Sequence, residues 1–319
     1  MPKLGKAPPL PDAALLPSTA EREELIFSFD TAAFDFRALL VSMFRATFSA
    51  EELALPPPDE AGTDCVGPAV GAQPGAGPAD GDEAGTLLSN LHRTALRGAA
   101  LTGCYATVLG GGAGCAAGGD EALPPATAEL RARFHALLLR FAREVAAPLV
   151  GCASADSVAF QRYPVLRVSF PSAKPHNPRH CDAQYHHQAG ELNFWLPLTA
   201  VWGGNTLHTE SAPGRADFHP LELGWGRCAR FWGNRARHKC LPNDSGFTRV
   251  SLDFRALPVR RFDAGFVDST GSPTFLRLGE YYRLGSESES EGSEEARVTA
   301  TAAMAAAAAA SGGGVWARR

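Results

Sequence analysis

Two segments with strict apolar–polar alternation constrain the fold of this chain more than any other feature. In residues 248–255, "TRVSLDFR", the apolar positions alternate with a polar set: Arg249, Ser251, Asp253 and Arg255. In residues 191–198, "ELNFWLPL", every second residue is again aliphatic or aromatic, and the positions between them are Glu191, Asn193 and Trp195. Successive side chains of a strand point to opposite faces. The sequence therefore predicts two strands with one face in the core. Because an ordinary sandwich fills its interior with aliphatic side chains, the polar face should line a cavity.

More strand-like segments surround these two. Residues 160–170 ("FQRYPVLRVSF"), 205–210 ("NTLHTE") and 228–233 ("CARFWG") are short, and Gly, Pro and Asn turns separate them. Three segments nearer the N-terminus have helical periodicity: residues 31–48, capped by Asp30 or Thr31, residues 86–109, and residues 127–150, capped by Thr127. Helices followed by many short strands predict an α+β fold whose second part is a sandwich or jelly roll.

Composition sets the expected boundaries within the 319 residues. We expect a flexible N-terminus (1–18), a Pro- and Gly-rich disordered insertion (56–86) and a low-complexity tail (284–319) in which "GSESESEGSEEAR" follows Leu284. The remainder, 19–283, should form a single domain because amphipathic helices need a sheet face to cover. Its helical part would be 19–150 and its strand-rich core 158–260.

Charge and cysteine content exclude several classes of partner. A net charge of −4 and a pI near 6.1 argue against a dedicated nucleic-acid binder. No apolar run approaches the roughly 20 residues that span a bilayer, and no signal-peptide pattern opens the chain. The seven cysteines are scattered and include no CxxC pair, which is typical of reduced thiols. We therefore expect a cytoplasmic protein that binds neither nucleic acid nor a membrane; the oligomeric state is open.

The segment "RHCDAQYHHQAGELNFWLPLT", residues 179–199, holds three histidines and an aspartate within eight residues. His180 and Asp182 are two positions apart, so an extended backbone would point both to the same side, where they can bind one ion. Polar loop residues often show this spacing by chance. A two-histidine, one-carboxylate site also needs a third ligand from a distant segment.

His208, His219 and His238 are the histidines downstream of this segment. His238 alone is followed at a suitable distance by a cation on a strand, Arg249. The alternative ligand pair is His208 and Glu210, which have the same spacing. If His238 completed a metal site with that pair, too little chain would remain between them for the strands that a sandwich has to interpose. The sequence therefore predicts a metal site formed by His180, Asp182 and His238.

In order and spacing, His180-x-Asp182, His238 and Arg249-x-Ser251 resemble the Fe(II)/2-oxoglutarate-dependent oxygenases. The segments "QRYPVLRVSFP", "NTLHTESAPGRADFHPLE" and "TRVSLDFR" resemble, more narrowly, a group that includes a streptomycin-biosynthesis protein, and more distantly the phytanoyl-CoA dioxygenases. The likeness covers about residues 158–260. It implies a double-stranded β-helix (jelly-roll, cupin-like) core, Fe(II) as cofactor, and 2-oxoglutarate and O₂ as cosubstrates.

The resemblance assigns roles to the residues that match it. His180, Asp182 and His238 would occupy one face of an octahedral iron and leave three positions open. The planar guanidinium of Arg249 would anchor the distal carboxylate of 2-oxoglutarate, with Ser251 as a further donor. Beyond this set, Asn193 and Tyr185 would bond the cosubstrate, and three residues are candidate substrate contacts: His187, Glu210 and Asp217.

The predicted activity is hydroxylation of a small metabolite with release of succinate and CO₂. A zinc-dependent hydrolase or a cupin-like isomerase is an alternative, since zinc accepts the same ligands. Arg249 with Ser251 argues against the hydrolase, which has no use for a carboxylate anchor. A protein hydroxylase and an inactive binding module are further alternatives.

Overall fold

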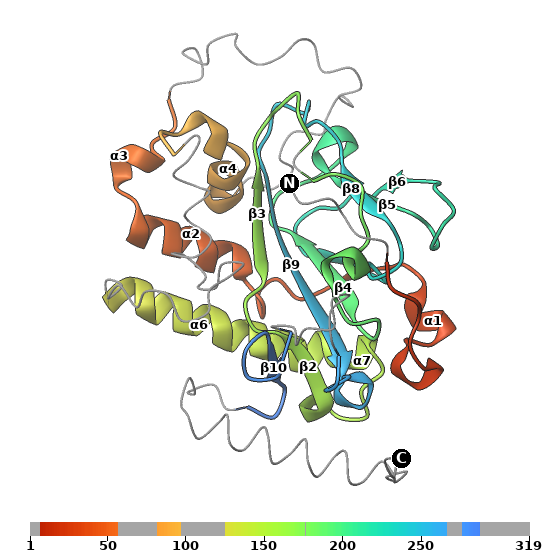
Figure 1. Ribbon diagram of the computed structural model, residues 1–319. Helices are drawn as coiled ribbons and strands as arrows, with labels where there is room; N and C mark the ends of the chain where they lie inside the picture. The colour runs from red at the N-terminus through yellow and green to blue at the C-terminus, as the bar shows by residue number, and fades with distance from the viewer. Residues whose placement is uncertain (1–6, 57–81, 97–124, 176, 267–275, 288–319) are drawn as a thin grey trace, which may run out of the picture.

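The computed structural model describes residues 7–56, 82–96, 125–175, 177–266 and 276–287, which form two antiparallel sheets and a set of helices (Figure 1). This arrangement confirms the predicted α+β class. Within those ranges, no helix is both long and apolar enough to cross a membrane. The four cysteines in the same ranges (Cys152, Cys181, Cys228 and Cys240) are free thiols.

The larger sheet carries the alternating segments. Its strands run in the order β1 (Leu25–Ser28), β7 (Arg227–Phe231), β4 (Leu192–Pro197), β9 (Arg249–Pro258), β2 (Val158–Gln161) and β10 (Tyr282–Leu284). Strand β3 (Val165–Ser169) pairs with the first half of β9, and β2 pairs with its second half. The smaller sheet has the order β6 (His219–Pro220), β5 (Leu207–Thr209) and β8 (His238–Cys240). Strand β9 is therefore the central element, with β4 along its other edge.

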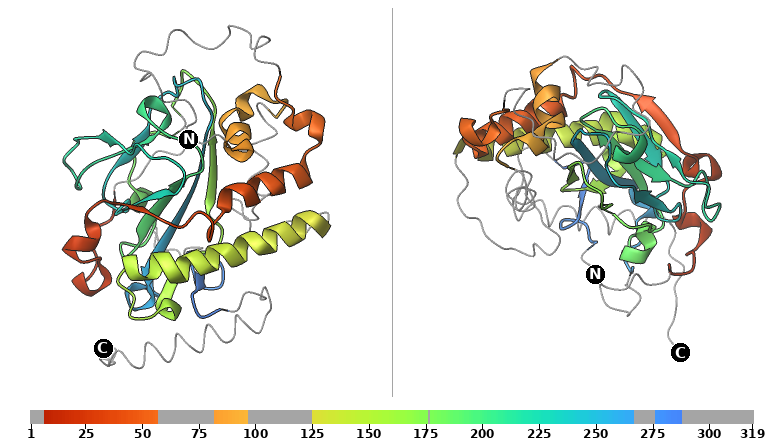
Figure 2. Two further views of the ribbon diagram at one scale, coloured as in Figure 1. Left: turned by 180° about the vertical axis from the view of Figure 1, so that it is seen from behind. Right: turned by 90° about the horizontal axis from the view of Figure 1, so that it is seen from above.

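Helices α2, α3, α4 and α6 lie on one side of the larger sheet, whereas α1 lies on the other, as the view from above shows (Figure 2). The longest are α2 (Phe36–Thr47) and α6 (Pro125–Phe141), which pack against each other. Helix α6 continues through a π-helical turn, Ala142–Ala146, into α7 (Ala147–Leu149). The shorter helices are α1 (Thr19–Arg22), α3 (Ala50–Leu53) and α4 (Glu83–Ser89).

The main core lies between these helices and the apolar face of β4 and β9. Phe254 of β9 stacks on Phe194 of β4 with ring centroids 5.2 Å apart and meets Phe141 of α6 edge-on at 6.1 Å. The alternation read from the sequence is thus confirmed, because the aliphatic and aromatic positions of both strands are in the core. The other face of the same strands is turned toward the smaller sheet.

The helix starts differ from those predicted. Helix α2 begins at Phe36, and its cap is Asp35, whose Oδ1 accepts from the amide of Ala38 at 2.9 Å. Asp30 instead accepts from Ala32 in the preceding turn, so the predicted Asp30 or Thr31 cap is wrong. An aspartate can cap a turn as readily as a helix, and the sequence does not separate the two.

Helix α6 begins at Pro125, so Thr127 lies inside it and is not its cap. Helix α4 begins at Glu83 and ends at Ser89, which puts the end of the expected disordered insertion, residue 86, inside a helix. The rest of the predicted helix 86–109 lies outside the described residues from position 97 on. Near the N-terminus, Ala13–Leu15 form a 3₁₀ helix within the segment expected to be flexible.

Candidate metal centre

His180, Asp182 and His238 come together in the structure. One potential ligand atom from each lies within 4.8 Å of the others, and all three residues are buried. The Nε2 atom of His238 is 3.4 Å from Oδ1 of Asp182, and Nε2 of His180 is 3.8 Å from the same oxygen. The two imidazole centroids are 4.3 Å apart. The fold therefore assembles the three ligands that the sequence predicts.

The backbone around His180 explains this placement. His180 and His238 form an antiparallel bridge, with N···O distances of 3.0 and 2.8 Å. Cys181 is extended (φ −122°, ψ 153°), which keeps His180 and Asp182 on one side, as expected. The predicted strand does not continue, however. Asp182 begins a 3₁₀ helix, and its amide donates to the carbonyl of Gly233 at 2.9 Å.

Both imidazoles are oriented for ligation through Nε2. The Nδ1 of His180 lies 2.8 Å from the carbonyl oxygen of Pro178, and that of His238 lies 3.1 Å from the carbonyl oxygen of Ala236. Because a carbonyl only accepts, each Nδ1 carries the proton and each Nε2 keeps its lone pair. Burial, together with the neighbouring His238, lowers the pKa of His180 to about 4, so this ring is neutral at neutral pH.

Of the two carboxylate oxygens of Asp182, one accepts hydrogen bonds and the other does not. Oδ2 accepts from Asn193 Nδ2 at 2.7 Å and from Arg255 Nε and Nη2 at 3.0 and 2.9 Å. Oδ1, which faces both imidazoles, is buried without any hydrogen-bond partner. Burial alone would raise the pKa of Asp182, but the Arg255 guanidinium holds it well below the usual value. A buried anionic oxygen without a donor, beside two Nε2 lone pairs, is the arrangement that a divalent metal satisfies.

Arg255 and Asn193 thus position the ligand. Arg255 is not among the site residues predicted from the sequence, although its place on the polar face of 248–255, six residues after Arg249, was a usable signal. Asn193 was predicted to bond the cosubstrate. In the structure its amide nitrogen donates to Asp182 and its oxygen accepts from the amide of Gly233 at 3.1 Å, so both of its groups are already engaged.

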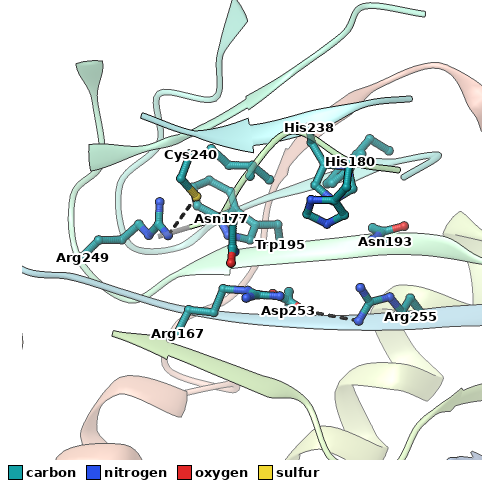
Figure 3. A pocket seen from close by; sticks show the side chains of 12 residues that line it. Arg167, Asn177, His180, Asn193, Trp195, His238, Cys240, Arg249, Asp253 and Arg255 are labelled. Carbon is teal, nitrogen blue, oxygen red and sulfur yellow. Dashed lines mark hydrogen bonds and ion pairs between the residues drawn. The ribbon is translucent and has the colours of Figure 1, made fainter. Parts of the chain in front are cut away.

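Two of the three ligands, His180 and His238, line a cavity between the two sheets, with about 390 Å³ of empty space including space open to solvent. Asp182 lies next to it, bonded to the lining residues Asn193 and Arg255. In Figure 3, His180 and His238 lie toward one end of this cavity, and Arg249 and Cys240 toward the other. Trp195 and Phe231 contribute an apolar wall. The polar faces of β4 and β9 therefore line a cavity, as their alternation predicts.

Arg249 is buried without a counterion. Only 2% of its surface is exposed; Nη1 donates to the carbonyl of Asn205 at 3.2 Å and Nη2 to Sγ of Cys240 at 3.3 Å. Its Nε has no hydrogen-bond partner, and within the described ranges it forms no ion pair. Ser251, on the same face, has a buried hydroxyl that is also unsatisfied. Buried charges are normally paired, so Arg249 is a candidate to bind an anion at this end of the cavity.

The other predicted site residues lie around the centre. Tyr185 is 43% exposed, and its ring centroid is 5.0 Å from that of His180, so it lies at the surface beside a ligand. His187 Nδ1 lies 2.9 Å from Oε2 of Glu191, and the hydroxyl of Tyr282 donates to the other oxygen of that buried carboxylate. Contact between Tyr185 and the cosubstrate remains a prediction, as does contact between His187 and the substrate.

Glu210 and Asp217 hold the loop in which they lie. The buried carboxylate of Glu210 accepts from the amides of Gly214, Ala216 and Arg237 at 3.1, 3.0 and 2.9 Å. Asp217 accepts from the amide and hydroxyl of Ser211. These partners are all local, and substrate contact by either residue stays a prediction. Among the residues described, no three-ligand group includes Glu210 or its rival partner His208.

Comparison with known proteins finds a relative but no matching family model. The chain is 33% identical over 127 residues to the streptomycin biosynthesis protein StrG of Streptomyces griseus. That match covers 40% of this chain and 60% of StrG, so the chain spans less than two thirds of its relative. The likeness to a streptomycin-biosynthesis protein, predicted from the motifs, is confirmed.

Two solved structures show partial similarity. A non-heme monooxygenase, the ThoJ–Ni complex, has 17% identity and a TM-score of 0.33, covering 55% of this chain and 72% of ThoJ. CytC3 with Fe(II) and α-ketoglutarate has 15% identity and a TM-score of 0.33, covering 51% of this chain and 67% of CytC3. Likenesses this weak support no statement about the fold or activity of this chain.

Proposed function

We propose that this protein is an Fe(II)- and 2-oxoglutarate-dependent oxygenase. One observation carries the proposal: a single cavity has a two-histidine, one-carboxylate centre at one end and a buried, uncompensated arginine at the other. The first feature suits Fe(II) and leaves coordination positions open. The second suits the distal carboxylate of a 2-oxo diacid. A zinc hydrolase or cupin-like isomerase accounts for the first feature and leaves Arg249 unexplained.

Each residue has a defined task in this proposal. His180, His238 and Oδ1 of Asp182 would hold the iron, while Arg255 and Asn193 keep Oδ2 occupied so that the carboxylate offers a single oxygen. Arg249 and Ser251 would bind and orient 2-oxoglutarate. When bound, Fe(II) supplies O₂ activation coupled to decarboxylation of the 2-oxo acid. Trp195 and Phe231 would keep water from that part of the cavity.

We further propose that the core is a double-stranded β-helix within one domain, 19–283. One apolar core joins α2, α6, β4 and β9, which supports a single unit. The two facing antiparallel sheets, with the metal ligands on the smaller sheet and on the segment bridged to it, support the jelly roll. The product would be a hydroxylated small metabolite, with succinate and CO₂ released, and the enzyme would act in the cytoplasm.

The test is anaerobic reconstitution with Fe(II), addition of 2-oxoglutarate, admission of air and measurement of succinate. We expect wild type to form succinate, slowly without substrate and faster with the right member of a metabolite panel. His180→Ala should form none.

His219→Ala is the matched control, because His219 lies outside the cavity and pairs with Glu24 at 3.0 Å. It should retain the wild-type succinate yield. An absence of succinate from wild type across the panel, or equal yields from wild type and His180→Ala, would overturn the proposal.

A further inference from the structure

The cavity carries more positive than negative charge. The arginines that line it are Arg167, Arg249 and Arg255; Asp253 also lines it, and Asp182 adjoins it as a partner of Arg255. Arg167 and Arg255 share Asp253: Arg167 Nε bonds to Oδ2, and Arg255 Nη1 lies 3.4 Å from Oδ1. One positive charge therefore remains. Under the proposed function a divalent metal and a 2-oxoglutarate dianion cancel each other, so this surplus persists in the loaded enzyme.

Arg167 is the arginine that an incoming molecule can reach. Its side chain is 31% exposed, compared with 8% for Arg255, whereas Arg249 as a whole residue is 2% exposed. The register of β3 on β9 places Arg167 opposite Ser251, so both lie on the cavity face. Figure 3 shows Arg167 beside Asp253 on the wall facing the two histidines.

The neighbours of Arg167 fit a small polar substrate better than a flat apolar one. Asn177, half-buried, also lines the cavity and offers an amide. Asp253 fixes Arg167 from one side and is itself already shared with Arg255, so it neutralises neither arginine fully. A partly exposed guanidinium held in place by a shared carboxylate is preorganised to bind a second, incoming oxyanion.

We propose that Arg167 is the substrate-binding residue of this site, and that the substrate is a small metabolite carrying a carboxylate or a phosphate. This inference rests on the proposed function and names its substrate class. Carboxylate and phosphate share the oxyanion chemistry that Arg167 recognises, and the experiment separates them. Arg249, deeper in the cavity, remains the anchor of 2-oxoglutarate.

The experiment uses the full chain loaded with Ni(II), which does not support turnover, and with saturating 2-oxoglutarate. Thermal melting is recorded with matched sets of probes: neutral sugars and alcohols, their phosphate esters, and their carboxylate counterparts. We expect a concentration-dependent rise in Tm with anionic members only. If the phosphate esters give the rise in Tm, the substrate carries a phosphate; if the carboxylates give it, the substrate carries a carboxylate.

Variants locate the binding. Arg167→Gln should weaken binding of the stabilising anion by about tenfold or more while leaving 2-oxoglutarate binding near wild type. Arg227→Gln is the matched control, since Arg227 is an exposed arginine at the start of β7.

The proposal is overturned if neutral probes stabilise as well as anions, if no anion stabilises, or if Arg167→Gln binds the anion as wild type does. It is also overturned if Arg167→Gln loses 2-oxoglutarate affinity to the extent expected of Arg249→Leu, since Arg167 would then belong to the cosubstrate site. Failure of the proposed function gives a different result: 2-oxoglutarate itself would neither bind nor raise Tm in the Ni(II)-loaded wild type.

Discussion

The two ends of the polar face of β9 differ in how their arginines are paired. At one end, Arg255 donates to Asp182 from two nitrogens and to Asp253 from a third. At the other end, Arg249 has a carbonyl and a thiol as partners, and its Nε has none. The strand, the face and the residue type are the same. This difference is what the proposed function expects, because Arg255 would support a metal ligand whose place is already set, whereas Arg249 would gain its counterion only when an anion binds.

Asp182→Ala should have the largest effect, because it removes a predicted metal ligand and leaves Arg255 with Asp253 and Gln161 as its partners. We expect metal affinity to fall by more than the roughly 10- to 100-fold typical of losing an outer partner. Equilibrium dialysis with Fe(II) under anaerobic conditions measures this. Near-normal metal binding would show that the three residues are not the metal site.

Arg249→Leu should weaken 2-oxoglutarate binding by about 100-fold or more, since a buried carboxylate would lose its charged partner. Metal affinity should stay near wild type. Calorimetric titration of 2-oxoglutarate into the metal-loaded variant gives the value. A collapse of metal affinity would mean that Arg249 supports the fold of the centre and does not receive the cosubstrate.

Arg255→Leu should reduce metal affinity by roughly 10- to 100-fold, because Asp182 would lose its orienting donor. It should also lower the free energy of unfolding by about 3–5 kcal/mol, since it strands a buried carboxylate. Urea unfolding of the metal-free protein measures the second effect. Arg249→Leu provides the contrast, because it removes an uncompensated buried charge and should not destabilise the protein.

Ser251→Ala should have the smallest effect. Loss of one hydroxyl donor to a bound carboxylate costs about 1 kcal/mol, or about fivefold in 2-oxoglutarate affinity. The metal-free protein should be at least as stable as wild type, since the hydroxyl is buried without a partner. An unchanged affinity for 2-oxoglutarate would place the cosubstrate away from Ser251.

Sequence patterns found the faces of the strands better than the contacts between them. The alternation in 248–255 separated Phe254 from Arg249 correctly, because a period of two is a local property of the backbone. The pairing of Arg255 with Asp182 was missed, since it depends on how β9 crosses the segment at 180–185, seventy residues earlier. The helix caps failed for a similar reason. Asp30 and Asp35 are equally good caps in sequence, and only the packing of α2 selects between them.

The metal ligands illustrate the same limit. Spacing placed His180 and Asp182 on one side, and the extended Cys181 bears this out. The strand expected to hold them is replaced by a single bridge to His238 and a 3₁₀ helix, because the backbone of Asp182 bonds to Gly233. Long-range hydrogen bonds of this kind leave no mark in local composition.

The most direct test is a paired anaerobic titration of Arg249→Leu and Arg255→Leu, first with Fe(II) and then with 2-oxoglutarate at saturating metal. We predict that the two losses separate: Arg255→Leu loses mainly metal affinity, and Arg249→Leu loses mainly 2-oxoglutarate affinity. Equal losses of Fe(II) affinity and 2-oxoglutarate affinity in both variants would contradict the assignment of Arg255 to the metal and of Arg249 to 2-oxoglutarate.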